Sequence, residues 1–396
     1  MKILFITPYI PSLIRVRPYN FIKYLSRRGH QITLLALVPP GESTDSLTEL
    51  RQWCRQVQTV PLPRWRTLWN GLRALPGSTP LQAAYSRSPE MATLVRQTLA
   101  ADTFDVVHVE HLRGAELAPT SAPVVFDSVD SITLLFELVR QAGPTRRSRL
   151  LAALDLARTR RYEGRLLARF PRVLVTSPRD KARLAELAPP DADTERIVVL
   201  PNGVDLAYFA PADTPRQPAT VVFTGKMSYH ANIAAALDLA HRVMPLVWQT
   251  FPQARLVLAG KDPPPELLGL SAEARITVTG SVPDLRPYLA QATVAVTPIR
   301  YGVGIQNKVL EAMAMAAPVV STPQAVSALQ VEPGREVLVG ESPQALAEAI
   351  VALLSNADLQ RRVGQAGRRF VERHHDWDAI AARLETVYEA ARADRV

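Results

Sequence analysis

The chain alternates short apolar segments with amphipathic ones from end to end. The first half holds six apolar segments rich in β-branched residues, each bounded by turn residues: KILFIT, QITLLALV, FDVVHVE, PVVFDS, RVLVTS and IVVLPN. Between the first two, RPYNFIKYLSRRGH has helical spacing and ends near Gly29, a residue type common just after a helix. Strands that alternate with helices pair in parallel, so this half predicts a mostly parallel sheet with helices on both faces.

The second half repeats this pattern with TVVFTG, RLVLAG, ITVTG, VAVTP and PVVST, after the Pro-rich polar stretch PNGVDLAYFAPADTPRQP. We therefore predict two Rossmann-like domains, residues 1–200 and 219–375, joined by a linker at 201–218. A last helix within 376–396 is expected to cross back to the first domain. Ligands of such sheets bind beyond the carboxyl ends of the strands, so we expect a site in the cleft between the domains.

Length and composition are those of a globular protein. The 396 residues exceed one ordinary core and fit two domains. The single cysteine, Cys54, excludes an intramolecular disulfide and fits a reducing compartment. No apolar run reaches the roughly 18–20 residues that span a bilayer, and the start lacks a signal-peptide core. We expect a cytoplasmic protein, and contact with the inner face of the membrane stays open.

The net charge of +9 lies entirely in the first half of the chain. Residues up to Asp205 contain 28 Lys and Arg against 19 Asp and Glu, whereas the remainder contains 18 of each sign. This excess favours an anionic partner for the first domain, such as a membrane surface, a phosphorylated lipid or an acidic glycan. The alternative is a solvated, arginine-rich helical face. Nucleic acid is not expected, because no recognisable binding module accompanies the charge.

The stretch YGVGIQNKVLEAMAMAAPVVST places a lysine at the start of a predicted helix. Apolar spacing predicts a helix from Asn307 to Met315. Lys308 then faces the positive end of the helix dipole, which costs about 0.3–1 kcal/mol in water. A bound anion would remove that cost. Glu311 follows on the same face, and a surface Lys–Glu pair is the alternative interpretation.

The loop before this helix completes a candidate diphosphate site. It brings the backbone amides of Val303, Gly304 and Ile305 toward the helix start, where amides and dipole together favour phosphate. The Glu311 carboxylate, one turn further along, would accept hydrogen bonds from the vicinal hydroxyls of a ribose. A nicotinamide cofactor is not expected, because no glycine follows the first predicted strand.

The run GIQNKVLEAMAMAAPVVST resembles the signature of glycosyltransferase family 4, the retaining enzymes of the GT-B fold. IVVLPNGVDLAYFAP is similar to the family's linker, and VVFTGKMSYHANIAAALDLA, ITVTGSVPDLRPYLAQATVAVTP and WDAIAARLETVYEA also have counterparts. The resemblance covers nearly the whole chain. It is closest in the branch associated with PEP-CTERM/exosortase exopolysaccharide systems.

The resemblance implies an α/β protein with two facing Rossmann-like domains, parallel sheets and an interdomain cleft. It also implies transfer of a sugar from a UDP- or GDP-linked donor, with retention at the anomeric carbon and with neither a cofactor nor an obligatory metal. The acceptor would be a glycan, a lipid-linked molecule or a small molecule. Two rivals stay open: a non-catalytic GT-B-like subunit that binds a glycan or a partner enzyme, and a GT-B sugar epimerase.

The resemblance also assigns expected roles to residues of the second domain. Glu311 matches the glutamate that holds the donor ribose, and Lys308 with the amides of Gly304 and Ile305 matches the phosphate loop. Lys226 in FTGKMS matches a basic residue that helps bind the donor diphosphate. Val282 falls where the family's backbone meets the nucleobase.

In the first domain, Glu110 aligns with a histidine near the transferred sugar, and His111 is next to it. An ordinary loop histidine is the alternative for His111. Two departures from the family pattern stand out. Val303 replaces the first glutamate of the signature, and Arg15 and Arg17 stand where paired glycines are usual. These arginines would meet donor phosphate or an anionic acceptor, with packing beside the first helix as the alternative.

The segment RWRTLWNGLRAL places Trp65 and Trp69 on one face of a short helix, among arginines. Tryptophan beside arginine suits a bilayer interface or a lipid acceptor tail. The alternative is an aromatic stripe buried against the first sheet. The pair Asp191 and Asp193 resembles a metal-binding motif, but it lies in a proline-flanked loop and no metal is expected there.

Overall fold

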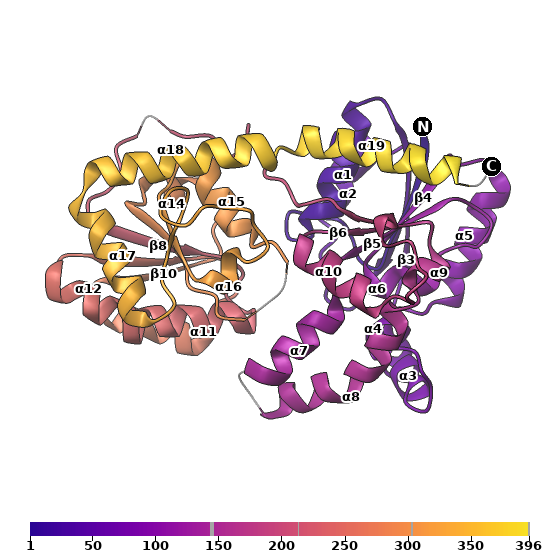
Figure 1. The fold of residues 1–396 in the computed structure, drawn as a ribbon, viewed down its shortest axis with the longest axis horizontal. Helices are drawn as coiled ribbons and strands as arrows, with labels where there is room; N and C mark the ends of the chain where they lie inside the picture. The colour runs from indigo at the N-terminus through magenta and orange to yellow at the C-terminus, as the bar shows by residue number, and fades with distance from the viewer. Residues whose placement is uncertain (143–145, 213, 302–303, 395–396) are drawn as a thin grey trace. The chain divides into compact units, whose positions relative to one another are not determined.

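The structure is a computed structural model that describes residues 1–142, 146–212, 214–301 and 304–394. The chain forms two compact units, whose elements are labelled in Figure 1. The first unit contains Met1–Asn202 and Trp377–Val396, and the second contains Gly203–Asp376. The predicted α/β class with parallel sheets is confirmed in both units.

The first unit is built on a seven-stranded sheet in the order β3-β2-β1-β4-β5-β6-β7, and all neighbouring strands are parallel. The strands are β1 (Lys2–Thr7), β2 (Gln31–Val38), β3 (Gln56–Pro61), β4 (Val106–Glu110), β5 (Val124–Val129), β6 (Arg172–Val175) and β7 (Ile197–Val199). Only β3 was not predicted. Its sequence, QVQTVP, is half polar because it forms an edge of the sheet.

Helices cover both faces of this sheet, since alternate residues of a strand point to opposite sides. Ile3 and Phe5 pack with α1 and α19, whereas Leu4 and Ile6 pack with α5, α9 and α10. The helices are α1 (Val16–Arg27), α2 (Leu47–Trp53), α3 (Arg64–Ala74), α4 (Leu81–Tyr85), α5 (Pro89–Ala101), α6 (His111–Gly114), α7 (Ile132–Ala142), α8 (Arg146–Glu163), α9 (Leu166–Arg169), α10 (Pro178–Leu187) and α19 (Trp377–Ala393).

The second unit is built on a six-stranded parallel sheet in the order β10-β9-β8-β11-β12-β13. The strands are β8 (Thr220–Thr224), β9 (Arg255–Ala259), β10 (Ile276–Gly280), β11 (Val294–Thr297), β12 (Val319–Ser321) and β13 (Leu338–Val339). The helices are α11 (His230–Asp238), α12 (Met244–Thr250), α13 (Pro265–Leu268), α14 (Arg286–Gln291), α15 (Asn307–Ala314), α16 (Pro323–Val326), α17 (Pro343–Ser355) and α18 (Ala357–His374).

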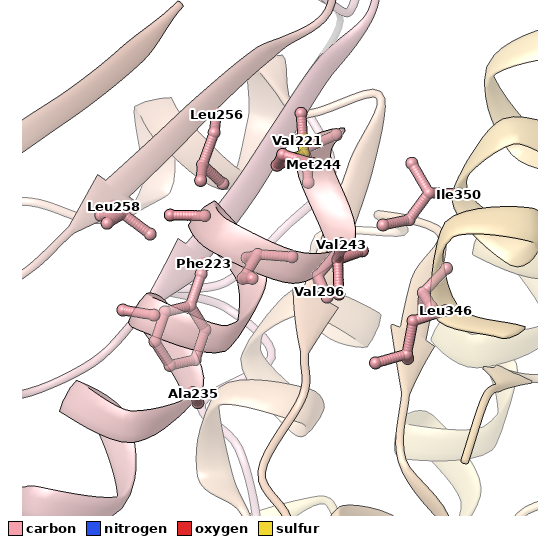
Figure 2. Packing of buried hydrophobic residues seen from close by; sticks show 14 of the residues in the cluster. Val221, Phe223, Ala235, Val243, Met244, Leu256, Leu258, Val296, Leu346 and Ile350 are labelled. Carbon is pink, nitrogen blue, oxygen red and sulfur yellow. The ribbon is translucent and has the colours of Figure 1, made fainter. Parts of the chain in front are cut away.

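Figure 2 shows one face of the second sheet in contact with its helices. Phe223 of β8 and Leu258 of β9 belong to one buried cluster with Val243, which lies between α11 and α12, and with Ile350 of α17. The other face packs against α15 and α18. The helix predicted from Asn307 is therefore confirmed as α15, held between the sheet and α18.

Both sheets reverse their strand order at one point, between β1 and β4 in the first unit and between β8 and β11 in the second. On either side of such a point, the connections leave toward opposite faces. The loops beyond the carboxyl ends then separate and leave room for a ligand. A ligand site is therefore expected at the residues that follow β1, β4, β8 and β11.

The last helix, α19, belongs to the core of the first unit although it comes at the end of the chain. Trp377 is 1% exposed and packs edge-on against Phe21 of α1, with ring centres 5.6 Å apart. Further along, the Tyr388 hydroxyl lies 2.9 Å from Nδ1 of His108 on β4. The helix thus closes one face of the first sheet.

Replacing Trp377 with alanine should therefore destabilise the first unit. The change removes a fully buried indole and leaves a cavity, which costs about 3–5 kcal/mol. Urea unfolding followed by far-ultraviolet circular dichroism measures the loss. Glu389→Ala on the exposed side of the same helix is the control and should unfold like the parent. Equal midpoints for Trp377→Ala and the parent would contradict this account of α19.

Candidate functional site

Lys308 lies in the first turn of α15, half-buried among polar and aromatic groups of the second unit. Its Nζ donates a hydrogen bond to Oδ1 of Asn232 at 2.5 Å and lies 4.6 Å from the centre of the Phe223 ring. Burial lowers the pKa of Lys308 to about 7, although the nearby carboxyl of Glu311 opposes the shift. The lysine is therefore only partly protonated near neutral pH, and an additional negative charge would favour its ammonium form.

Two glycines let the loops after β8 and β9 approach this lysine. A Cβ added to Gly225 would lie 2.8 Å from the Nζ of Lys308, and one added to Gly260 would lie 1.7 Å from the carbonyl oxygen of Gly225. Their φ angles are +152° and +153°, values that residues other than glycine rarely adopt. The loops can therefore reach this arrangement only with glycine at both positions.

Asn232 of α11 joins the two lysines that the sequence singled out. Its Oδ1 accepts from Lys308, and its Nδ2 donates to the backbone carbonyl of Lys226 at 2.8 Å. The side chain of Lys226 itself is exposed. Asn232 was not predicted from the sequence, because one asparagine near the start of a helix belongs to no recognisable pattern.

The start of α15 differs from the starts of several other helices of this chain. Within the described residues, α5, α10, α16 and α17 begin with Ser or Thr followed by Pro, and the hydroxyl accepts from a first-turn amide. Among the same residues, no side chain caps α15 at Gln306, and its first turn holds no acid. The first turn of α15 therefore lacks the side-chain cap seen at those four helices, and the Val309 amide donates to the Gln306 carbonyl at 2.9 Å.

The remaining residues predicted for the second unit lie around α15 or further across the sheet. Glu311 is half-buried in α15, and burial raises the pKa of its carboxyl to about 7. Gly304 has a φ of +71°, and the side chain of Ile305 packs in the core. Val282 follows β10, two strands away from β8. Val303 lies outside the described residues.

In the first unit, a buried carboxyl group lies at the switch point, the place between β1 and β4 where the strand order reverses. Glu110 ends β4 and is 1% exposed, and it accepts a hydrogen bond from the Tyr9 hydroxyl at 2.8 Å. Burial raises the pKa of Glu110 well above its usual range, and the negative charge of Asp127 adds to the shift. Its Oε2 has no hydrogen-bond partner among the described residues. Burial therefore favours the neutral form of Glu110, and the side chain retains one polar atom without a partner among the described residues.

His111 follows Glu110 in a conformation that is uncommon for a residue with a side chain. Its φ is +62°, and its Nδ1 accepts from the backbone amide of Arg113 at 3.2 Å. The ring hydrogen of the neutral imidazole is therefore on Nε2. Burial, together with the charges of Arg113 and Arg15, lowers the pKa of His111 to about 3. The ring is thus a neutral hydrogen-bond donor at physiological pH.

The two arginines predicted to meet an anion have different surroundings. Arg15 is exposed, and its guanidinium lies 4.5 Å from the centre of the Tyr9 ring. Arg17 is 3% exposed, and its Nε donates to Oδ2 of Asp127 at 2.6 Å. Its Nη1 donates to the carbonyl of Leu200 at 2.8 Å. For Arg17 the packing alternative is correct, because its charge is already neutralised inside the unit.

The predicted tryptophan segment forms α3, and its aromatic face is exposed. The exposed fractions of Trp65 and Trp69 are 61% and 53%. The alternative of a stripe buried against the first sheet is therefore wrong. In the described part of the chain, no helix combines the length and the apolar character needed to cross a bilayer.

In the described part of the chain, the His, Cys, Asp and Glu side chains form no group of three suited to a metal ion. Asp193 accepts a hydrogen bond from the amide of Glu195 at 3.1 Å, so it acts as the first residue of a turn.

Loss of the buried arginine should destabilise the first unit. Arg17→Ala leaves the Asp127 carboxylate buried without its cation, which costs about 3–5 kcal/mol. Chemical denaturation measures this loss. The double variant Arg17→Ala/Asp127→Ala should lose less than the sum of the two single variants, because it removes the stranded charge. Unchanged stability of Arg17→Ala would contradict the packing role.

Two family descriptions match the chain. Glycosyltransferase Family 4 matches residues 15–208, and Glycosyl transferases group 1 matches residues 218–356. Together they cover most of the sequence, and each falls almost entirely within one structural unit.

Individual relatives agree with these matches. Phosphatidyl-myo-inositol mannosyltransferase of Mycobacterium tuberculosis is 26% identical over 98% of this chain and 97% of its own length. GDP-mannose:cellobiosyl-diphosphopolyprenol alpha-mannosyltransferase of Xanthomonas campestris is 28% identical over 56% of this chain and 59% of its own length.

Solved structures show the fold. Sucrose-phosphate synthase from Thermosynechococcus elongatus superposes with a TM-score of 0.71 at 18% identity, covering 99% of both chains. Anabaena Alr3699/HepE, solved in complex with UDP and glucose, gives 0.68 at 15% identity, covering 98% of this chain and all of its own. With two parallel-sheet units and both family matches, the chain belongs to the glycosyltransferases of family 4 and has the GT-B fold.

Proposed function

We propose that this glycosyltransferase moves a hexose from a UDP- or GDP-linked donor to a glycan, a lipid-linked molecule or a small molecule. Transfer retains the configuration at the anomeric carbon and needs no metal. The second unit binds the donor, and the first unit binds the acceptor. The site lies in the cytoplasm, and its products enter polysaccharide or glycolipid synthesis, in keeping with the resemblance to the PEP-CTERM/exosortase branch.

The observation that carries this proposal is the position of Lys308. Its amino group lies at a helix start without a side-chain cap, beyond the carboxyl ends of β8 and β11. Gly225 lies directly beside this group, and Gly260 packs against Gly225. A diphosphate would supply the negative charge that this group lacks, and it would accept hydrogen bonds from the amides of α15. Placed in this way, the ribose would be within the reach of Glu311, one helical turn further on.

The chemistry then depends on stabilising the leaving group. As the bond between the sugar C1 and the diphosphate oxygen breaks, negative charge collects on the diphosphate. Lys308 and the α15 amides are in place before the reaction, and Lys226 adds a mobile cation. The acceptor oxygen attacks the same face of the sugar, and its proton passes to a donor phosphate oxygen. The Gly304 and Ile305 amides bind phosphate, and the backbone at Val282 contacts the base.

In the first unit, His111 and Arg15 are the proposed substrate contacts. The neutral His111 ring offers an Nε2 hydrogen to a hydroxyl of the transferred sugar. Glu110 is too deeply buried for direct contact, and we assign it a positioning role for the loop that carries His111. Arg15 is exposed and faces an anionic group of the acceptor.

The relatives suggest which sugar to test first. The mycobacterial and Xanthomonas relatives are named for mannosyl transfer to lipid or lipid-linked acceptors, whereas Anabaena HepE was solved with UDP and glucose. We therefore place GDP-mannose first and UDP-glucose second. A lipid-linked acceptor also suits the basic first half of the chain.

A direct test is release of nucleotide from a panel of UDP- and GDP-sugars, with and without lipid-linked glycan acceptors, in the presence of a metal chelator. Turnover of one donor, with product of retained configuration by NMR, supports the proposal. Thermal stabilisation by nucleotides without turnover of any donor favours the rival, a non-catalytic glycan-binding or partner subunit.

Removing the ammonium group should weaken diphosphate binding. Lys308→Ala is expected to lose about 1.5–3 kcal/mol of affinity for a nucleoside diphosphate, the strength of a charge-assisted hydrogen bond. Affinity for the free nucleoside should change little, and isothermal titration calorimetry measures both. Arg242→Ala removes an exposed cation of the same unit and serves as the charge control. Equal diphosphate affinity of Lys308→Ala and the parent would exclude the phosphate role.

Glu311→Gln tests the ribose contact. The change turns one acceptor oxygen into a donor and should weaken binding of a ribonucleotide by about 1.5–3 kcal/mol. A 2′-deoxynucleotide lacks one of the two hydroxyls and should lose less on the same change. If both nucleotides respond alike, Glu311 is not the ribose ligand.

A further inference from the structure

Exposed large apolar side chains of the first unit gather on two helices that are distant in sequence. On α3 and just after it, they are Trp65 (61% exposed), Leu68 (69%), Trp69 (53%), Leu72 (61%) and Leu75 (52%). On α8 they are Leu150 (61%), Leu151 (55%) and Leu154 (62%). A monomeric soluble protein rarely leaves so many large apolar groups in water at one place unless they contact something.

The two helices are held at the same end of the unit. Arg158 of α8 donates a hydrogen bond to the carbonyl of Leu75, and Asp155 of α8 accepts from the amide of Leu81 at 2.9 Å. Figure 1 shows α3, α4 and α8 at the same end of the unit, and α4 packs against α3. Leu154 lies about 6 Å along the helix axis from Arg158, at 1.5 Å per residue. We call these eight side chains the α3–α8 surface.

Packing within the unit does not account for this surface. Thr67 and Ala74 face the protein on α3, and Ala152 and Leu156 do so on α8. Each helix therefore has a buried side and, in addition, an apolar side in water. An amphipathic helix that only covers a core has charged and polar residues on its outer side.

Arginines surround the apolar side chains. On α3, the guanidinium of Arg66 lies 4.7 Å from the Trp65 ring centre, and that of Arg73 lies 5.5 Å from the Trp69 ring centre. Arg64 and Arg149 are exposed on the same two helices. Beside α8 is an open groove of about 770 Å³. Its lining includes Ser78, Thr79, Arg161, Arg165 and Arg169.

The acidic groups nearby are already engaged. Asp155 accepts from the Leu81 amide, and Glu90 pairs with Arg66 at 2.6 Å. Glu163 is buried, and it accepts from the first amides of α7 at Ile132 and Thr133. The face that the two helices offer to solvent is therefore apolar at its centre and positively charged around it.

We propose that the α3–α8 surface binds an anionic lipid bilayer. The tryptophans and leucines enter the boundary between headgroups and acyl chains, and the arginines of α3 and of the groove contact lipid phosphates. A bilayer matches both features at once, since its headgroup region offers apolar contact and negative charge side by side. The sequence suggested the α3 segment, with its tryptophans among arginines; the α8 leucines and the groove arginines as parts of the same surface come from the structure. This proposal does not depend on the donor chemistry.

Sedimentation with vesicles tests the proposal on the full chain. The parent should sediment with vesicles of phosphatidylcholine and phosphatidylglycerol at low ionic strength. It should stay in solution with phosphatidylcholine alone, and with the anionic vesicles at about 1 M salt, where the Debye length is about 3 Å. Trp65→Ala/Trp69→Ala, Leu150→Ala/Leu154→Ala and Arg161→Gln/Arg165→Gln should each bind about tenfold more weakly or worse. Leu268→Ala, which changes a leucine that is 50% exposed in the second unit, should bind like the parent.

Two outcomes would overturn the proposal. One is that the parent stays in solution with anionic vesicles at low salt. The other is that Leu150→Ala/Leu154→Ala binds like the parent, which would remove α8 from the contact. Sedimentation velocity without lipid covers a further possibility. A parent dimer that these substitutions dissociate, together with no vesicle binding, would make the surface an interface between two copies. Circular dichroism checks that each variant is folded.

Discussion

Lys308 holds its amino group against an amide oxygen and the face of a ring, with the Glu311 carboxyl nearby, and several residues of the second unit are arranged around that position. A side chain at Gly225 would collide with the lysine, and a side chain at Gly260 would collide with the backbone of Gly225. Asn232 uses both ends of its amide to hold the lysine and the Lys226 backbone. Desolvation lowers the pKa of the lysine although the Glu311 carboxyl opposes the shift, so a bound anion would favour the ammonium form.

The first unit uses its switch point differently. There, Arg17 donates to the Asp127 carboxylate, and Glu110 accepts from the Tyr9 hydroxyl. The Arg17 guanidinium also holds the carbonyl of Leu200, so one side chain joins α1, β5 and the chain after β7. In the function that we propose, the polar groups that the first unit offers to substrate are the neutral His111 ring and the exposed Arg15. The second unit would meet the donor diphosphate with Lys308.

Elements with strong local patterns were predictable from sequence, and single long-range contacts were not. Eleven strands follow from apolar runs, whereas β3 and β13 were missed because one is half polar and the other has two residues. Lys308 was found because a lysine in a first helical turn conflicts with the dipole. Asn232, Tyr9 and Asp127 were not given roles, because their partners lie 76, 101 and 110 residues away. The same limit explains why the sequence left two roles open for Arg17. Its buried ion pair with the distant Asp127 leaves no pattern in the local sequence.

The account depends on Lys308 being an ammonium that a diphosphate completes, and its pKa tests this most directly. NMR titration of the side-chain nitrogen, with Lys308→Ala to assign the signal, measures the pKa with and without a nucleoside diphosphate sugar. The account predicts a pKa of about 7 in the free protein and a clearly higher value in the complex. Donor affinity should accordingly fall as the pH rises above 7, because the deprotonated lysine must first take up a proton. An ordinary lysine pKa of about 10.4 that does not change when the donor binds would contradict the account.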